Sequence, residues 1–288
     1  MAGPLSHIKV VDLSRVLAGP WSTQMLGDLG AQVTKIERPH AGDDTRHWGP
    51  PFITNADGSR GDAGYFLCTN RNKTSLQLDI TSDAGQATIR DMVKQADILV
   101  ENYKVGGLKK YGLDYDSLKD LNPGLIYCSI TGFGQTGPYA KRPGYDFMIQ
   151  AMSGLMSVTG EKDGLPGAGP QKVGIAIADL MTGMYASVGI LAALAHRDQT
   201  GEGQYIDLAL LDCQMAMLSN QGSNYLVGGS APKRMGNAHL NIVPYQVMPT
   251  KDGHLIIAVG NDSQFQSFCR LCARQDCAND PRFATNEA

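Results

Sequence analysis

The sequence predicts an α/β protein in which helices cover a largely parallel sheet. Short apolar runs typical of buried strands alternate with helical stretches along the first half of the 288 residues. Strands that alternate with helices in this way usually lie side by side and parallel. Hydrophobic residues make up 42% and charged residues 18% of the chain, which is an ordinary globular composition.

The chain is predicted to open with a strand over residues 7–14, where Ile, Val and Leu dominate. Pro20 then opens a helix, because proline is favoured in the first helical turn, and Gly30 ends it. The next strand is predicted at 32–38. These elements form the first strand–helix–strand unit of the sheet.

A second unit of the same kind follows. Residues 76–80 are expected to form a strand, and Thr81 or Ser82 can cap the helix after it. Buried strands are then predicted at 97–102 and 125–134. In such a sheet, ligands bind beyond the carboxyl ends of the strands.

The second half of the chain is predicted to be richer in helix. A Met-rich helix is expected at about 145–158, a long helix follows Asp179, and 203–210 is strand-like. A helical run at 211–226 leads into the polar segment 228–234. The Gly, Ser and Pro residues of that segment indicate a domain boundary.

A new strand at 254–260 and a helix from Asp262 are expected after this boundary. We therefore predict a large domain over 1–210, a helical linker over 211–234, and the beginning of a smaller α+β domain over 235–288. The smaller domain shows no evident closing element.

Charge and cysteine usage narrow the classes of function. The formal net charge of -3 argues against a nucleic-acid partner. Cys269, Cys272 and Cys277 form a cluster, but no second Cys or His pair follows at zinc spacing, so no metal site is expected. The scattered remaining cysteines are typical of a reducing compartment.

Neither a targeting segment nor a membrane span is expected. The amino terminus lacks an apolar leader and an Arg-rich amphipathic stretch, which predicts a cytoplasmic protein, or a mitochondrial one if the source is eukaryotic. Residues 173–195 are apolar enough for a span, but they contain Asp179, and a lone Asp is costly in lipid. We expect a buried helix there.

Asp179 is the most informative residue, because it is the single charged residue of that apolar stretch. One interpretation is structural: Asp at a helix start accepts backbone N–H bonds as an N-cap. The other is catalytic: the helix N-terminus keeps the carboxylate ionised in an apolar setting, where it is a competent nucleophile toward an acyl group. The two interpretations are compatible.

Several side chains near predicted strand ends are candidates for anion binding. Arg38 follows the strand at 32–38 and suits a phosphate, or it is a solvated surface residue. Arg46 and Trp48 either bind an acid and stack on a ligand or anchor their loop. A further group at the end of strand 97–102 can hold an adenine and a phosphate or simply form a turn: Asn102, Tyr103 and Lys110.

Together these segments resemble the class III CoA-transferases. The matching stretches occur in the family's order: VVDLSRVLAGPWSTQMLGDLGAQVTKIERPHAGDDTR, NRNKTSLQLDI, DILVENY, YCSITGFGQTGP, RPGYD, IAIADLMTGMYASVGILAAL and TGEGQYIDLALLD. The resemblance implies a Rossmann-like large domain with a parallel sheet plus a smaller domain, usually in an interlocked homodimer. It also implies that coenzyme A is a substrate and that no cofactor is permanently bound.

The resemblance assigns roles residue by residue. Asp179 matches the family's catalytic aspartate, and Arg38 matches an arginine near the CoA nucleotide. Val16 and Ala18 match backbone contacts to CoA, and Arg142 and Tyr145 match the segment near the pantetheine arm. The remaining CoA-binding matches are Asn102, Tyr103 and Lys110, and the substrate candidates are Arg46, Trp48 and His239.

Within the family, the chain looks most like the succinate–glutarate (hydroxymethylglutarate) group, on the stretches GDDTRHWGPPF, SNYLVGG and AHLNIVPYQ. We therefore predict CoA transfer from an acyl-CoA donor, succinyl-CoA, to a carboxylic or dicarboxylic acid through an aspartyl-CoA thioester on Asp179. Leu17 replaces the glutamine of formyl-CoA transferases, and His239–Ile242 replaces their glycine-rich loop, so oxalate and formate are not expected. The chain also looks C-terminally truncated relative to the family.

Two alternatives remain open from the sequence. One is an isomerase like the α-methylacyl-CoA racemases, but Tyr145 stands where those enzymes have a histidine, and tyrosine is a poor proton-transfer group at its ordinary pKa. The other is a non-catalytic fragment or pseudoenzyme that binds CoA or a partner chain. The apparent truncation is the reason to consider it.

Overall fold

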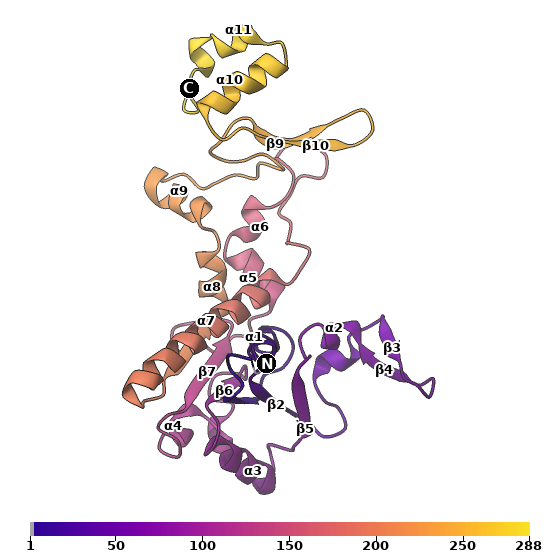
Figure 1. The fold of residues 1–288 in the computed structure, drawn as a ribbon, viewed down its shortest axis with the longest axis vertical. Helices are drawn as coiled ribbons and strands as arrows, with labels where there is room; N and C mark the ends of the chain where they lie inside the picture. Colours follow the sequence, from indigo (N-terminus) through magenta and orange to yellow (C-terminus); the bar gives the residue numbers. More distant parts are fainter. Residues whose placement is uncertain (1–2) are drawn as a thin grey trace. The chain divides into compact units, whose positions relative to one another are not determined.

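The computed structural model describes residues 3–288, which form two compact units (Figure 1). The first unit contains the residues up to Ser153 together with Gly174–Met217, and the second contains Gly154–Val173 and Leu218–Ala288. This division differs from the predicted domains 1–210, 211–234 and 235–288. Residues 154–173 belong to the second unit, and the predicted linker is divided between the two.

A six-stranded parallel sheet forms the centre of the first unit, so the predicted α/β class is confirmed. The strand order is β5-β2-β1-β6-β7-β8. Their bounds are β1 Lys9–Asp12, β2 Gln32–Glu37, β5 Lys73–Gln77, β6 Ile98–Glu101, β7 Ile126–Thr131 and β8 Tyr205–Ala209. The strand predicted at 76–80 is thus shifted, because pairing with β2 begins at Lys73.

Helices cover both faces of this sheet (Figure 1). On one face, Val10 and Val100 pack with side chains of α1 (Ala18–Asp28) and α7 (Ile177–Thr200). On the other, Val11 and Leu99 pack with side chains of α3 (Asp83–Val93). Neighbouring strand residues point to opposite faces of the sheet. Because helices cover both faces, the buried strands are apolar on both.

The helix starts and ends follow local chemistry. Ser82 caps α3, because its hydroxyl accepts the Gly85 N–H at 3.1 Å, as one of the two predicted caps requires. The helix predicted over 145–158 is instead two helices, α5 (Asp146–Met152) and α6 (Leu155–Val158). Gly154 between them has a φ of 92°, a left-handed conformation that ends a helix.

The first unit also contains short elements around the sheet. They are η1 Asp44–His47, β3 Phe52–Thr54, β4 Arg60–Ala63, α2 Gly64–Leu67, η2 Lys109–Tyr111, α4 Tyr115–Leu118 and α8 Leu210–Ala216. The antiparallel pair of β3 and β4 was not predicted, since its strands are only three and four residues long.

Helix α7 is the one helix of residues 3–288 that is long and apolar enough to cross a membrane. Of its apolar 18-residue stretch, 44% is buried inside the protein. Its buried stripe includes Thr182, Gly183, Ala186 and Ile190. This stripe lies against α1, where Gly183 approaches the carbonyl oxygen of Ala18 closely. Packing in the first unit therefore accounts for the apolar character of that stripe.

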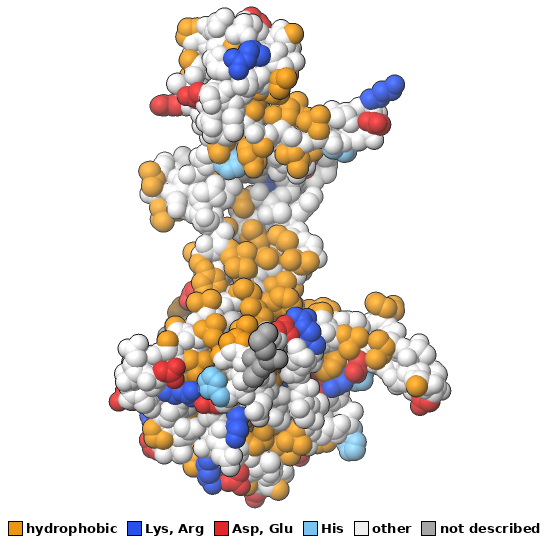
Figure 2. Space-filling view, viewed as in Figure 1, with side chains coloured by type: hydrophobic (Ala, Val, Ile, Leu, Met, Phe, Trp, Pro, Cys, Tyr) orange, Lys and Arg blue, Asp and Glu red, His pale blue; other side chains and the backbone are white. Residues whose placement is uncertain are grey.

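The second unit is built around an antiparallel pair of strands. Its elements are α6, α9 Asn220–Gly228, β9 Tyr245–Pro249, β10 His254–Ala258, α10 Asp262–Leu271, α11 Gln275–Ala278 and η3 Pro281–Phe283. Figure 2 shows hydrophobic side chains on the surface of this unit, and Val227 and Ile256 are strongly exposed.

Candidate active site

Asp179 lies in the first turn of α7, but it does not cap the helix. The N-cap residue is Ala176, which has no side-chain acceptor. Asp146, the first residue of α5, supplies the cap: its Oδ1 accepts the N–H of Ala178 at 2.8 Å and the N–H of Asp179 at 3.3 Å. The interpretation of Asp179 as an N-cap is therefore wrong, because a carboxylate distant in sequence takes that place.

The electrostatic setting of the Asp179 carboxyl also differs from the prediction. Desolvation raises its pKa most, and the negative charge of Asp146 raises it further, to about 7. These two effects outweigh the helix dipole, which was expected to keep the group fully ionised. Among residues 3–288, no hydrogen bond to the Asp179 side chain is found. At neutral pH the carboxyl is therefore divided between its two forms.

Asp179 lines a cavity of about 400 Å³ at the carboxyl ends of β1, β6 and β7. The wall is made by the loop after β1, the turn after β6, the loop after β7, and the starts of α5 and α7. This cavity brings together most of the residues predicted as a site: Val16, Ala18, Asn102, Tyr103, Arg142, Tyr145 and Asp179. Open α/β sheets bind ligands at this edge.

A second cavity of about 420 Å³ adjoins the first, because both are lined by Arg15, Asn102, Tyr103 and Lys104. It contains the two predicted nucleotide-binding cations, Arg38 and Lys110. The Arg38 side chain is 54% exposed and pairs with Asp44 at 2.6 Å. A positively charged hollow next to the Asp179 cavity suits the phosphates of a nucleotide.

Two predicted CoA contacts have structural roles as well. Asn102 bonds the backbone of Arg15 twice: its Oδ1 accepts the Arg15 N–H at 3.0 Å, and its Nδ2 donates to the Arg15 carbonyl at 2.7 Å. The Val16 N–H donates to the carboxylate of Asp43. Both contacts fix the loop between β1 and α1.

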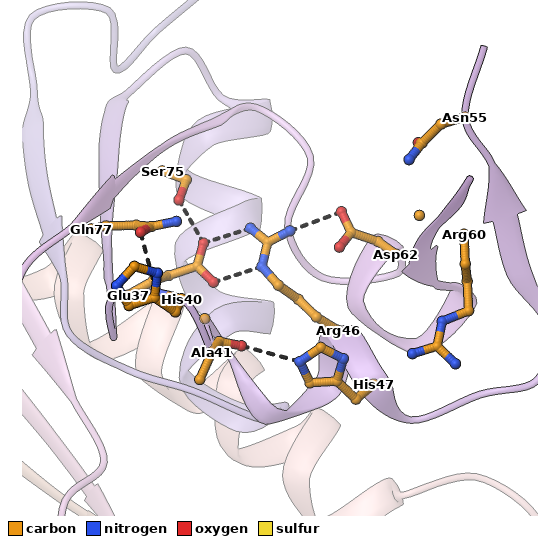
Figure 3. A pocket seen from close by; sticks show the side chains of 12 residues that line it. Glu37, His40, Ala41, Arg46, His47, Asn55, Arg60, Asp62, Ser75 and Gln77 are labelled. Atoms are coloured by element: carbon orange, nitrogen blue, oxygen red, sulfur yellow. Dashed lines mark hydrogen bonds and ion pairs between the residues drawn. The ribbon is translucent and has the colours of Figure 1, made fainter. Parts of the chain in front are cut away.

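Arg46 takes no part in the Asp179 cavity. In a separate polar cavity of about 450 Å³, its guanidinium lies between Glu37 and Asp62 (Figure 3), donating to them over 2.6–2.8 Å. It also lies 3.7 Å over the Phe66 ring. Burial opposes ionisation of Glu37, but the Arg46 contacts lower its pKa to about 2. Arg46 therefore ties β2 to β4, and its role in binding substrate stays a prediction.

Trp48 also lies outside the lining of the Asp179 cavity. Its ring packs edge-on against Tyr65 in α2, with 5.2 Å between the ring centres. Burial, and then the charge of Asp179, raise the Tyr65 pKa to about 12, so this phenol lies within the electrostatic field of Asp179. Tyr65 was not predicted, because nothing in its local sequence distinguishes it from a packing residue.

His239 belongs to the second unit. Its ring packs against Tyr245 with 5.3 Å between the ring centres, and its Nδ1 accepts the N–H of Asn241 at 3.0 Å. A role in binding substrate stays a prediction.

Sequence reasoning missed Glu101, the last residue of β6. Its carboxyl accepts hydrogen bonds from the Ser129 hydroxyl and from the Tyr103 N–H. Burial nevertheless raises its pKa to about 7. The signal was present, since an acid that ends an apolar strand in DILVEN must be buried or paired. Across residues 3–288, no group of three His, Cys, Asp or Glu side chains is placed to hold a metal ion.

Comparison with known proteins identifies the class to which this fold and site belong. The model of CoA-transferase family III matches residues 5–288. The chain therefore belongs to CoA-transferase family III and is an enzyme of the transferase class. Enzymes of this family use CoA thioesters as substrates, which agrees with the cavities at the sheet edge.

Individual relatives are similar over nearly the whole chain. The succinate–glutarate CoA-transferase of Agrobacterium fabrum is 56% identical over 285 residues, and the succinyl-CoA:glutarate CoA-transferase of Mus musculus is 46% identical over 283 residues. A solved CAIB/BAIF family protein from Brucella suis has a TM-score of 0.86 and 55% identity, covering 99% of this chain and 74% of its own.

These alignments cover 99% and 98% of this chain, and they give no support to the predicted truncation. The chain spans 70% of the length of the Agrobacterium relative and 63% of that of the mouse relative.

Proposed function

We propose that this chain transfers coenzyme A from succinyl-CoA to a dicarboxylic acid, with Asp179 as the covalent nucleophile. The names of the Agrobacterium and mouse relatives, a succinate–glutarate and a succinyl-CoA:glutarate CoA-transferase, support this donor and this class of acceptor. The observation that carries the proposal is the Asp179 carboxyl itself, which lies in a cavity, free of the helix cap and partly ionised at neutral pH.

The first half-reaction begins when the ionised Asp179 oxygen attacks the thioester carbonyl of succinyl-CoA. The C–S bond breaks, leaving a mixed anhydride on Asp179 and a CoA thiolate. The thiolate then attacks the aspartyl carbonyl of the anhydride. Succinate leaves, and Asp179 now carries CoA as a thioester.

The second half-reaction runs the same steps in reverse with the new acid. A carboxylate oxygen of the acceptor attacks the aspartyl thioester and releases the CoA thiolate. The thiolate attacks the acceptor carbonyl of the resulting anhydride, which yields the new acyl-CoA and restores the Asp179 carboxylate. The free energy of the thioester is retained because no water takes part in any step.

The charges around the cavity suit these substrates. Lys104, Lys141 and Arg142 line it together with the two acids Asp146 and Asp179. A cationic rim attracts the phosphates of CoA and the free carboxylate of a dicarboxylic acid, while the acids lie where the thioester must react. The nucleotide end of CoA then extends toward the neighbouring cavity that contains Arg38 and Lys110.

The proposal is tested by incubating the 288-residue chain with succinyl-CoA and a series of dicarboxylic acids of increasing length, and by following new acyl-CoA. Intact-protein mass spectrometry without acceptor should show covalently bound CoA. Asp179→Asn, which keeps the size of the side chain, should abolish both signals while the melting temperature stays within a few degrees of wild type. An Asn variant that still exchanges CoA at the wild-type rate would refute the nucleophile.

A further inference from the structure

The loop between β1 and α1 contains an unusual backbone conformation at Val16. Its φ of 70° lies in the left-handed region. A β-branched residue rarely adopts this conformation, because its Cβ substituents crowd the neighbouring backbone. Such a conformation persists only where the surroundings impose it. Val16, Leu17 and Ala18 also line the cavity of Asp179, so the shape of this loop is the shape of the cavity wall.

Asp43 is the group that holds Val16. Both oxygens of its carboxylate accept the Val16 N–H, at 3.3 and 3.2 Å. One of them also accepts the N–H and the hydroxyl of Thr45, at 3.0 and 2.8 Å, which fixes the carboxylate independently of Val16. The Asp43 side chain is completely buried, where an unpaired charge would be costly.

Lys35 supplies the counter-charge from β2. Its Nζ lies 2.9 Å from Asp43 Oδ2, and its side chain is 2% exposed. The same Nζ donates to the carbonyl of Ser14 at 2.8 Å. Because Asn102 bonds both backbone groups of Arg15 from the end of β6, Ser14, Arg15 and Val16 are each tied by a different side chain.

We propose that Asp43, held in place by Lys35, is a positioning residue for the CoA thioester: it keeps Val16 left-handed and thereby sets the wall formed by Val16, Leu17 and Ala18. The inference rests on the proposed function of the Asp179 cavity. Without the Asp43 carboxylate, Val16 relaxes toward an ordinary φ, and the wall is correct for only a fraction of the time. The apparent affinity for acyl-CoA then falls to that fraction of its full value.

A purely structural role must be separated from this positioning role. Asp43→Asn keeps the size of the side chain, but its NH₂ group must face either the Lys35 ammonium or the donors of Thr45 and Val16, so in both orientations the hold on Val16 should loosen. Val16→Gly provides the separation, because glycine adopts a φ of 70° without steric cost. If Asp43 acts through Val16, glycine at position 16 should make Asp43 less important. If Asp43 only stabilises the core through Lys35, glycine at position 16 should change nothing.

The experiment compares wild type, Asp43→Asn, Val16→Gly and the double variant, with Asp91→Asn as the matched surface control. We expect Asp43→Asn to raise KM for succinyl-CoA about tenfold, the result if the loop is competent about one-tenth of the time, with a smaller change in kcat. The double variant should return to within about threefold of Val16→Gly. The loss of melting temperature caused by Asp43→Asn should also be smaller in the Val16→Gly background.

An equal rise of KM in both backgrounds, or no rise at all, would overturn the inference. If the wild-type chain transfers no CoA, the proposed function fails. The melting temperatures then decide whether Asp43 holds Val16: equal losses in both backgrounds refute the clamp, and a smaller loss beside glycine supports it.

Discussion

At the scale of single residues, Asp146 and Asp179 divide two tasks that one carboxylate was expected to perform. Asp146 is engaged as the helix cap and as an acceptor for Gln150 at 2.7 Å. Asp179 is left without these bonds and is also destabilised as an anion by its neighbour. The negative charge of Asp146 opposes ionisation of Asp179. The carboxyl proposed as the nucleophile is therefore poorly solvated.

This arrangement predicts a pH-dependent rate. In the proposed mechanism the ionised form of Asp179 attacks the thioester, so kcat/KM for acyl-CoA should fall about tenfold per pH unit as the pH drops below about 7. Asp146→Asn removes the neighbouring charge and lowers the Asp179 pKa, so the fall should move to lower pH. Asp116→Asn, which changes an exposed acid, should leave the profile unmoved. A profile that is flat through neutral pH would contradict the assignment.

The same shift has a consequence for folding. Asp179 binds its proton more tightly in the folded protein than an ordinary Asp does in the unfolded chain. The contribution of Asp179 to folding stability therefore decreases as the pH rises from the unfolded pKa through about 7. Melting temperatures of wild type and Asp179→Asn, measured across this range, should diverge with increasing pH in favour of the Asn variant.

Arg38 offers a second test at this scale. Its exposed guanidinium lines the cavity assigned to the nucleotide, and a charge-assisted contact to phosphate contributes roughly 1.5–3 kcal/mol. Arg38→Ala should weaken CoA binding about tenfold or more in calorimetry, with little change in turnover at saturation. Arg282→Ala, which removes an even more exposed arginine, paired with Asp280 in the second unit, serves as the control. Unchanged affinity of the Arg38→Ala variant would show that Arg38 is a surface residue that does not bind CoA.

At the scale of elements, the crossing of α1 and α7 explains where glycine is required. A Cβ on Gly183 would lie 2.6 Å from the Ala18 carbonyl oxygen and 2.9 Å from the Trp21 ring, so the two helices could not approach as they do. A Cβ on Gly189 would meet Ile206 at 3.6 Å, an ordinary contact. Position 183 therefore requires glycine, whereas position 189 has room for the Cβ of alanine.

The matched pair gives a prediction for stability. Gly183→Ala should lower the free energy of unfolding by about 1–3 kcal/mol, because the helices must shift. Gly189→Ala should raise it by about 0.5–1 kcal/mol, because alanine restricts the unfolded chain and favours the helix. Urea denaturation of both variants measures the difference. Equal effects from the two substitutions would show that the α1–α7 contact is loose.

The elements predicted correctly from the sequence are those with a local signal. The strands around 7–14 and 97–102 are short apolar runs, and Ser82 caps α3 as its position indicates. What could not be predicted depends on partners distant in sequence. The Asp146 cap lies 33 residues from Asp179, and Asp62, one of the two carboxylate partners of Arg46, lies 16 residues from it. No spacing within one motif reveals such a partner.

At the scale of the whole molecule, the parallel sheet explains why the candidate site could be assembled from separate motifs. Parallel strands end at one edge, so the loops after β1, β6 and β7 meet there whatever their distance in sequence. The division of the chain into units had no such rule. Residues 154–173 belong to the second unit, although the residues before and after them belong to the first, and composition alone did not indicate this.

The outer side of α7 predicts self-association of the chain. Met184, Val188 and Leu191 lie four and three residues apart, so they share one helix face, and Val188 is 62% exposed. Contiguous exposed apolar side chains mark surfaces that pack against another protein. A second copy of the chain is the expected occupant, since the resemblance to the family implies a homodimer.

The test is sedimentation of wild type beside Val188→Lys over a range of concentrations. Wild type should sediment as a dimer, and Val188→Lys should shift toward monomer, because a lysine ammonium buried in an apolar interface loses its hydration. Gln199→Lys adds the same charge to an exposed polar position of α7 and should leave the dimer unchanged. If both variants remain dimeric, the face of Val188 is not the interface; if wild type is monomeric at all concentrations, the predicted homodimer is wrong for this chain.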